Sequence, residues 1–224
     1  MKVIALLPMK GHSERVKNKN MRLFDGYPLY HAVMRSLLAS KYVHQVVIDT
    51  DSDRIAQDAH LSFGNDVMIV KRPLQIQGDF VSMNDIIAYD LSQLEGEYFL
   101  QTHSTNPLLT TRTLNNAIED YFNNLADHDC IFSVTKVQTR FYDQAAKPIN
   151  HNPQELLRTQ DLPPWYEENS NFYIFSKEAF RKAGNKRIGL KPKIYEMNKL
   201  EAVDIDDPED FILAELLYKN REKQ

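Results

Sequence analysis

Short apolar runs alternate with amphipathic segments along most of the 224 residues, and this alternation constrains the fold more than any other feature. The apolar runs are typical of buried strands, and the longer segments between them are typical of helices. Strands separated by helices form βαβ units with right-handed crossovers, so the pattern predicts an α/β fold with a mainly parallel sheet. The predicted strands span residues 2–8, 45–49, 67–71, 97–101, 130–137, 171–175 and 201–205. The predicted helices span residues 28–39, 52–62, 82–94, 111–125, 177–183 and 208–219.

The composition limits the class of protein. Hydrophobic residues make up 42% and charged residues 26%, which is typical of a globular protein, and the length suits a single domain over 1–224. The net charge of −4 argues against a general nucleic-acid binder. The sequence has no apolar stretch long enough to span a membrane, and Pro8, Lys10 and His12 interrupt the first apolar run too early for a signal peptide. We therefore expect no membrane partner and a cytoplasmic location.

One region breaks the alternation. Residues 138–168 contain four prolines, and a loop this long inside a compact domain is usually functional or an interface. Leu156, Leu157, Leu162 and Trp165 provide apolar side chains for such an interface. We interpret this region as an inserted arm that meets a second subunit, with a surface excursion as the alternative.

A basic loop follows the first predicted strand. Residues 10–20 carry four cations, Lys10, Arg15, Lys17 and Lys19, together with Gly11. Ligands of open α/β sheets bind at the carboxyl ends of the strands, and lysines and backbone N–H groups there can neutralise phosphates. The spacing is neither that of a P-loop nor that of a dinucleotide fingerprint. The loop therefore predicts a phosphate site, with a solvated lysine-rich turn as the alternative.

Two further loops follow predicted strands. Arg72 lies in Lys-Arg-Pro, where it can reach a ligand phosphate or base, and the following Ser82 forms a capping pair with Asp85. The loop 101–107 carries six hydrogen-bonding side chains. Within it, His103 alone is more often a hydrogen-bonded structural residue than a catalyst.

Two carboxylates lie near the C-terminus. Asp204 and Asp206 are two residues apart, so on a strand they share one face and can bind one magnesium ion. Asp207 suits an N-cap and Pro208 suits the first helical position, so capping explains the residues after the pair but not the pair itself. Arg158 is a candidate partner for a carboxylate, or forms a surface ion pair within the arm.

Together these segments resemble the acylneuraminate cytidylyltransferase family, which includes the CMP-sialic acid synthetases. The family's opening motif, Pro-Ala-Arg-Gly-Gly-Ser-x-Arg-x-x-x-Lys-Asn, is similar to Pro-Met-Lys-Gly-His-Ser-Glu-Arg-Val-Lys-Asn-Lys-Asn at residues 8–20. The resemblance spans nearly the whole chain in the right order. Its later landmarks are Asp49–Asp53, Arg72–Pro73, Asp79, Ser82, Arg187–Gly189, Tyr195–Glu196 and Asp204–Phe211.

The resemblance implies the reaction CTP + acidic sugar → CMP-sugar + pyrophosphate, on a Rossmann-like three-layer nucleotidyltransferase domain, with Mg²⁺ and as a homodimer. It implies that Lys10, Lys19 and Asp206 are catalytic, and that Asp204 and Asp206 hold the metal. The implied nucleotide-binding residues are Lys10, Gly11, Ser13, Lys19, Asn20, Arg72 and Ser82. The implied sugar-binding residues are Gln101, Arg158 and Tyr173.

Several departures from the family pattern leave the acceptor open. Lys10 replaces an arginine and so loses the bidentate fork, and His12 replaces a glycine. The loop 101–107 is two residues longer than its counterpart, and the motif at 169–173 is altered. The acceptor is therefore a sialic acid or another acid, such as a ketodeoxyoctulosonate-, legionaminate- or pseudaminate-like sugar or a phosphonate. A different class, a non-catalytic nucleotide-binding subunit, is the remaining alternative.

Overall fold

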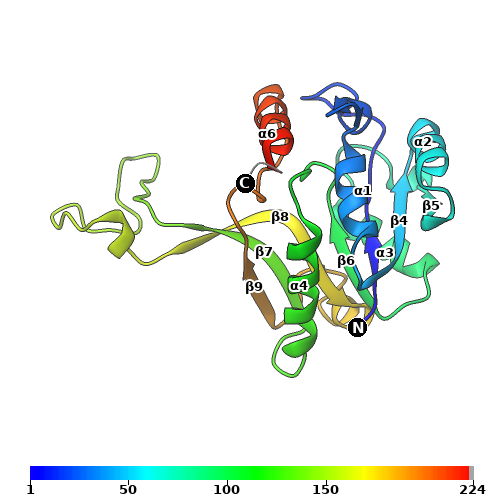
Figure 1. The fold of residues 1–224 in the computed structure, drawn as a ribbon. Helices are drawn as coiled ribbons and strands as arrows, with labels where there is room; N and C mark the ends of the chain where they lie inside the picture. The colour runs from blue at the N-terminus through cyan, green and yellow to red at the C-terminus, as the bar shows by residue number, and fades with distance from the viewer. Residues whose placement is uncertain (222–224) are drawn as a thin grey trace.

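The computed structural model describes residues 1–221 and contains a seven-stranded sheet in the order β5-β4-β1-β6-β8-β7-β9 (Figure 1). Every neighbouring pair in this sheet is parallel except the two pairs that β8 makes, so the predicted α/β fold with a mainly parallel sheet is confirmed. The strands are β1 (Val3–Leu6), β4 (Val43–Thr50), β5 (Val67–Lys71), β6 (Tyr98–Thr102), β7 (Cys130–Val137), β8 (Trp165–Ser176) and β9 (Pro192–Glu196). A separate hairpin consists of β2 (Leu23–Phe24) and β3 (Tyr27–Pro28).

Helices cover both faces of the sheet (Figure 1). The helices α1, α2 and α4 share one apolar cluster with the sheet, and α3 and α5 share the cluster on the opposite face. Burial of these two clusters provides the main driving force for the three-layer arrangement. The helices are α1 (Tyr30–Leu38), α2 (Asp53–Phe63), α3 (Met83–Gln93), α4 (Thr111–Asn123), α5 (Lys177–Lys182) and α6 (Pro208–Asn220). Short 3-10 helices lie at Lys19–Met21, Gly64–Asp66, Leu74–Ile76 and Thr159–Asp161.

The predicted strand at 201–205 is wrong. This segment forms turns and irregular backbone, and the N–H of Ile205 donates to the carbonyl of Thr105 at 2.9 Å. The outer strand that pairs in parallel with β7 is instead β9, which the sequence pattern did not predict. Exposed and half-buried positions alternate along β9, and it begins with a proline, which suits an edge strand but weakens the apolar signal.

The predicted arm leaves the body of the molecule between β7 and β8 (Figure 1). Its last residues, 165–168, belong to β8 and pair with the end of β7, from Trp165 opposite Val137 to Glu168 opposite Val134. Leu162 is buried, whereas Leu156 is 90% exposed. The arm therefore presents apolar surface to solvent in the single chain.

The sheet topology brings the predicted site loops to one edge. The carboxyl ends of β1, β4, β5 and β6 lie together because these strands are parallel. The strand β8 runs in the opposite direction, so its first half lies at the same edge, with Phe172 opposite Thr102. No helix within residues 1–221 is both long enough and apolar enough to cross a bilayer.

Candidate nucleotide-binding cleft and the adjoining acidic pocket

A cleft of about 320 Å³ opens at this edge of the sheet. Three loops line it: the basic loop after β1, the loop after β5 and the loop after β6. Five of the predicted nucleotide-binding residues line the cleft, namely Lys10, Ser13, Lys19, Asn20 and Arg72. Gly11 is adjacent to the lining residue Lys10, and Ser82 lies between the lining residues Val81 and Met83.

Hydrogen bonds hold the basic loop in place. The N–H of Gly11 donates to Oδ1 of Asp51 at 2.6 Å. Nδ2 of Asn20 donates to the carbonyl of Lys10 at 2.9 Å, and its Oδ1 accepts from the hydroxyl of Ser104 at 2.6 Å. Asn20 is buried and therefore ties the start of the basic loop to the loop after β6.

Glycine is required at position 11 because the basic loop passes close to Ser52. A Cβ at this position would lie 2.9 Å from Cβ of Ser52, which is the N-cap residue of α2. Real Cβ atoms do not approach a carbon this closely, so any side chain at position 11 displaces the loop.

The cations of the loop face carboxylates and carbonyls. Lys10 pairs with Asp79, and Arg15 pairs with Asp206 at 2.6 Å. Nζ of Lys19 donates to the carbonyl of Ile205 at 2.5 Å. Burial lowers the pKa of Lys19, while the charges of Asp206 and Asp204 oppose that shift.

A second pocket adjoins the cleft on its acidic side. It is lined by Thr135, Glu167, Glu168, Asn169, Ser170, Ala202, Asp204 and Asp206. Burial is the main cause that raises the pKa of Asp204, and its Oδ1 is buried without a hydrogen-bond partner. The two predicted metal ligands therefore meet in one pocket although no strand carries them. Within residues 1–221, no group of three or more His, Cys, Asp or Glu side chains forms a ready metal cage.

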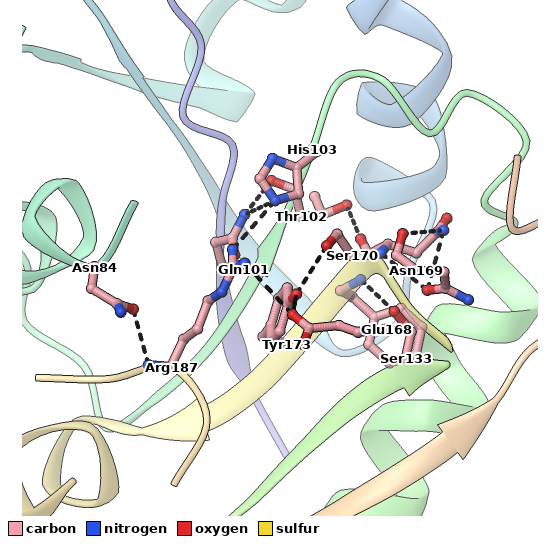
Figure 2. A network of polar contacts seen from close by, with 12 residues as sticks. Asn84, Gln101, Thr102, His103, Ser133, Glu168, Asn169, Ser170, Tyr173 and Arg187 are labelled. Carbon is pink, nitrogen blue, oxygen red and sulfur yellow. Dashed lines mark hydrogen bonds and ion pairs between the residues drawn. The ribbon is translucent and has the colours of Figure 1, made fainter. Parts of the chain in front are cut away.

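Two predicted sugar-binding residues, Gln101 and Tyr173, lie in one polar network (Figure 2). Arg187 joins them: its guanidinium stacks 3.7 Å above the ring of Tyr173 and donates to Oε1 of Gln101 at 2.8 Å. The hydroxyl of Tyr173 donates to Glu168, which lines the acidic pocket. Burial and the charge of Arg187 lower the pKa of His103 to about 3, so its imidazole is neutral in this network.

Two of the predicted site residues, Arg158 and Ser82, make their contacts with neighbours in sequence. Arg158 remains in the arm and pairs with Asp161 at 2.7 Å, which is the alternative that the sequence left open for it. Ser82 is the N-cap of α3: its hydroxyl accepts from the N–H of Asp85 and donates to the side chain of Asp85.

Neither the motifs nor the family resemblance indicated a role for Arg187, Glu168 or Asp90. Arg187 lies in one of the segments that resemble the family, and this was the only indication in the sequence that it belongs to the site. Asp90 lies inside α3 among apolar residues, and no local pattern sets it apart. Arg187 and Asp90 lie beside groups from distant parts of the chain, whereas Glu168 accepts from Tyr173 of the same strand and lies 3.9 Å from Arg187.

Comparison with known proteins decides the family. The sequence model described as cytidylyltransferase matches residues 4–223. The chain belongs to the cytidylyltransferase family. This membership confirms the resemblance drawn from the motifs.

Curated relatives of this chain differ in length. It is 29% identical to N-acylneuraminate cytidylyltransferase A of Danio rerio over 95% of the chain and 50% of that protein. It is 26% identical to pseudaminic acid cytidylyltransferase of Campylobacter jejuni subsp. jejuni serotype O:2 over 98% of the chain and 97% of that protein. The chain therefore spans about half the length of the fish relative and nearly all of the bacterial one.

Solved structures with the same fold are also known. The chain superposes on CMP:2-keto-3-deoxy-manno-octonic acid synthetase complexed with CTP with a TM-score of 0.70, at 12% identity over 100% of both chains. It superposes on 4-diphosphocytidyl-2C-methyl-D-erythritol synthase of Anaerococcus prevotii with a TM-score of 0.67, at 12% identity over 97% of this chain and 99% of the other. The likeness agrees with the predicted three-layer nucleotidyltransferase fold.

Proposed function

We propose that this chain transfers the cytidylyl group of CTP to an acidic sugar of the ulosonic type and releases pyrophosphate. The observation that carries the proposal is the cationic cleft at the carboxyl ends of the parallel strands, with an acidic pocket beside it. The family membership and the names of the relatives support the same reaction.

In this proposal the cleft binds the triphosphate. Phosphoryl transfer depends on positioning and on neutralisation of charge more than on covalent chemistry. Lys10 and Lys19 supply positive charge from the basic loop, and Ser13 and the N–H groups near Gly11 supply hydrogen bonds. Asn20 holds the loop, so these groups need little reorganisation when the nucleotide binds.

The residues present fit a magnesium ion. Asp204 and Asp206 line one pocket, and the buried oxygen of Asp204 that lacks a partner is an available hard ligand. These two carboxylates would hold the ion, with water completing its coordination. The ion would add charge neutralisation to that of the lysines.

The acceptor side is assigned to the network around Gln101 and Tyr173. The relatives are named for N-acylneuraminate and pseudaminic acid, and both names describe acidic sugars. We therefore assign an acidic ulosonic sugar as the acceptor class, with sialic, pseudaminic and ketodeoxyoctulosonic acids as the members to test.

The arm supports a homodimer. It projects from the body (Figure 1). Leu156 and Leu157 of the arm are exposed. In a dimer, the arm of one subunit would place Arg158 near the acceptor pocket of the other. The cytoplasmic location stays a prediction from the sequence.

Pyrophosphate release tests the proposal. The four nucleoside triphosphates are each combined with Mg²⁺ and with N-acetylneuraminic, pseudaminic or 3-deoxy-manno-octulosonic acid. We expect release with CTP and one of the acids, and little release with the other nucleotides. Binding of CTP without release from any acid would instead favour the non-catalytic nucleotide-binding subunit.

A further inference from the structure

Arg187 is held by several contacts between the cleft and the acidic pocket. Its backbone N–H donates to Oδ1 of Asn84 at 3.2 Å, and its guanidinium lies flat on Tyr173 and donates to Gln101 (Figure 2). Of its neighbours, His103 lines the cleft and Glu168 lines the acidic pocket. The side chain is therefore fixed where a nucleotide and an acceptor would meet.

The charge of Arg187 is poorly compensated within the chain. Its nearest carboxylate is Glu168, and the two atoms closest to each other, Nη2 and Oε1, are 3.9 Å apart. The same Oε1 already accepts from the hydroxyl of Tyr173. The side chain of Arg187 is only 19% exposed, so little water replaces the missing carboxylate. A guanidinium held in this way is stabilised when a ligand supplies a carboxylate.

Most other cations near the site have closer partners, and Lys19 donates to the carbonyl of Ile205. Lys10 pairs with Asp79, Arg15 with Asp206 and Arg72 with Asp49. Arg158 pairs with Asp161 inside the arm. Of Arg15, Arg72, Arg158 and Arg187, only Arg187 lacks a carboxylate oxygen closer than 3.9 Å within residues 1–221, and its side chain is largely buried.

We infer that Arg187 binds the carboxylate of the acidic acceptor, with Tyr173 and Gln101 holding its guanidinium in place; this inference rests on the proposed function. The planar fork of Arg187 matches a carboxylate, whereas the hydroxyl groups of a neutral sugar would leave its charge uncompensated. The bond to Gln101 engages Nη1 of Arg187 and leaves Nε and Nη2 available to a carboxylate.

The test compares an acid with its methyl ester. The probe is whichever of N-acetylneuraminic, pseudaminic and 3-deoxy-manno-octulosonic acid the wild type converts fastest with CTP, together with the methyl ester of that acid. The variants are Arg187→Met and Arg187→Gln, the second of which keeps a donor for Gln101. The control is Lys186→Met, which removes the adjacent exposed cation.

In the wild type and in Lys186→Met, we expect the KM for the ester to exceed that for the acid by about 10-fold to 100-fold, since hydrogen bonds to charged groups have this magnitude. In Arg187→Met the KM for the acid should rise to that for the ester, while the Kd for CTP and the melting temperature stay near those of the wild type. If Arg187→Met does not melt cooperatively, Arg187→Gln gives the same comparison.

Two results would overturn the inference while the proposed function stands. Either Arg187→Met keeps the wild-type KM for the acid, or it raises the KM for acid and ester equally, as a structural brace would. An inactive wild type on all three acids would instead overturn the proposed function, and the inference with it.

Discussion

Arg72 donates from Nε to Oδ1 of Asp49 at 2.5 Å, and both side chains are buried, with exposed fractions of 4% and 0%. A second buried carboxyl, that of Asp90, lies beside this pair. Neither oxygen of Asp90 has a hydrogen-bond partner, and burial, then the charge of Asp49, raises its pKa to about 9. A neutral Asp90 leaves Arg72 and Asp49 as a balanced ion pair beneath the cleft.

Asp90→Asn should reduce the pH dependence of stability. The pKa of Asp90 is higher in the folded chain than in the unfolded chain, so between about pH 4 and pH 9 the folded state binds the extra proton. The free energy of unfolding therefore falls as the pH rises, by at most about 1.4 kcal/mol per pH unit for one proton. Asparagine cannot lose a proton, so the variant should show a shallower fall.

Urea unfolding of the two proteins at several pH values between 5 and 9 checks this prediction. Asp85→Asn, which changes an exposed carboxylate on the same helix, is the control and should keep the wild-type slope. Parallel slopes for Asp90→Asn and the wild type would contradict the protonated state assigned to Asp90.

Lys10→Ala should lower kcat/KM for CTP by about 100-fold to 1,000-fold, because it removes a preorganised cation from the triphosphate. Asp79, which pairs with Lys10, is exposed, and such pairs contribute little. Asp79→Asn should therefore change kcat/KM by less than about 10-fold. Steady-state pyrophosphate release measures both variants, and a larger loss in Asp79→Asn than in Lys10→Ala would reverse the assigned roles.

Gly11→Ala should raise the Kd for CTP by about 10-fold to 100-fold, because the new Cβ meets Cβ of Ser52 and displaces the loop. Ser52→Gly removes that Cβ, and glycine costs little at an N-cap. The double variant should therefore recover most of the affinity. Isothermal titration with CTP measures all three proteins, and an unrescued double variant would show that the clash is not the cause.

Asp206→Asn should lower the Mg²⁺-dependent rate by at least about 100-fold, because it removes one of two proposed metal ligands. The fold should survive, since the ion pair between Arg15 and Asp206 lies at the surface. Glu209→Gln changes a nearby exposed acid of α6 and is the matched control. Turnover measured against Mg²⁺ concentration checks the assignment, and a wild-type rate in Asp206→Asn would remove Asp206 from the metal site.

Leu156→Glu should dissociate the proposed dimer, because it places a charge on the exposed apolar surface of the arm. Leu61→Glu provides a control, since Leu61 is 85% exposed on α2 and lies outside the arm. Sedimentation equilibrium gives the mass of each protein. A wild type that sediments as a monomer at micromolar concentration would contradict the dimer itself.

Much of the fold could be predicted because the signals were local. The apolar runs of β1, β4, β5, β6 and β7 have the length of buried strands, and α2, α3 and α4 begin at capping serine or threonine residues. Ser82 and Asp207 cap α3 and α6 as their spacing indicated. The edge strand β9 was missed, and the irregular segment 201–205 was wrongly predicted as a strand. In both segments the order of apolar and polar residues reflects contacts with distant residues.

The sequence alone determined which side chains follow the carboxyl ends of the parallel strands, and hence that Lys10, Lys19 and Arg72 face one cleft. This is so because strand direction follows from the βαβ pattern. Only the tertiary structure decided which groups meet across the sheet. Arg187 reaches Tyr173 and Gln101 because β8 inserts antiparallel beside β6, and Asp90 reaches Asp49 because α3 packs against the sheet. Such pairings depend on the order of the strands, and local periodicity carries no information about that order.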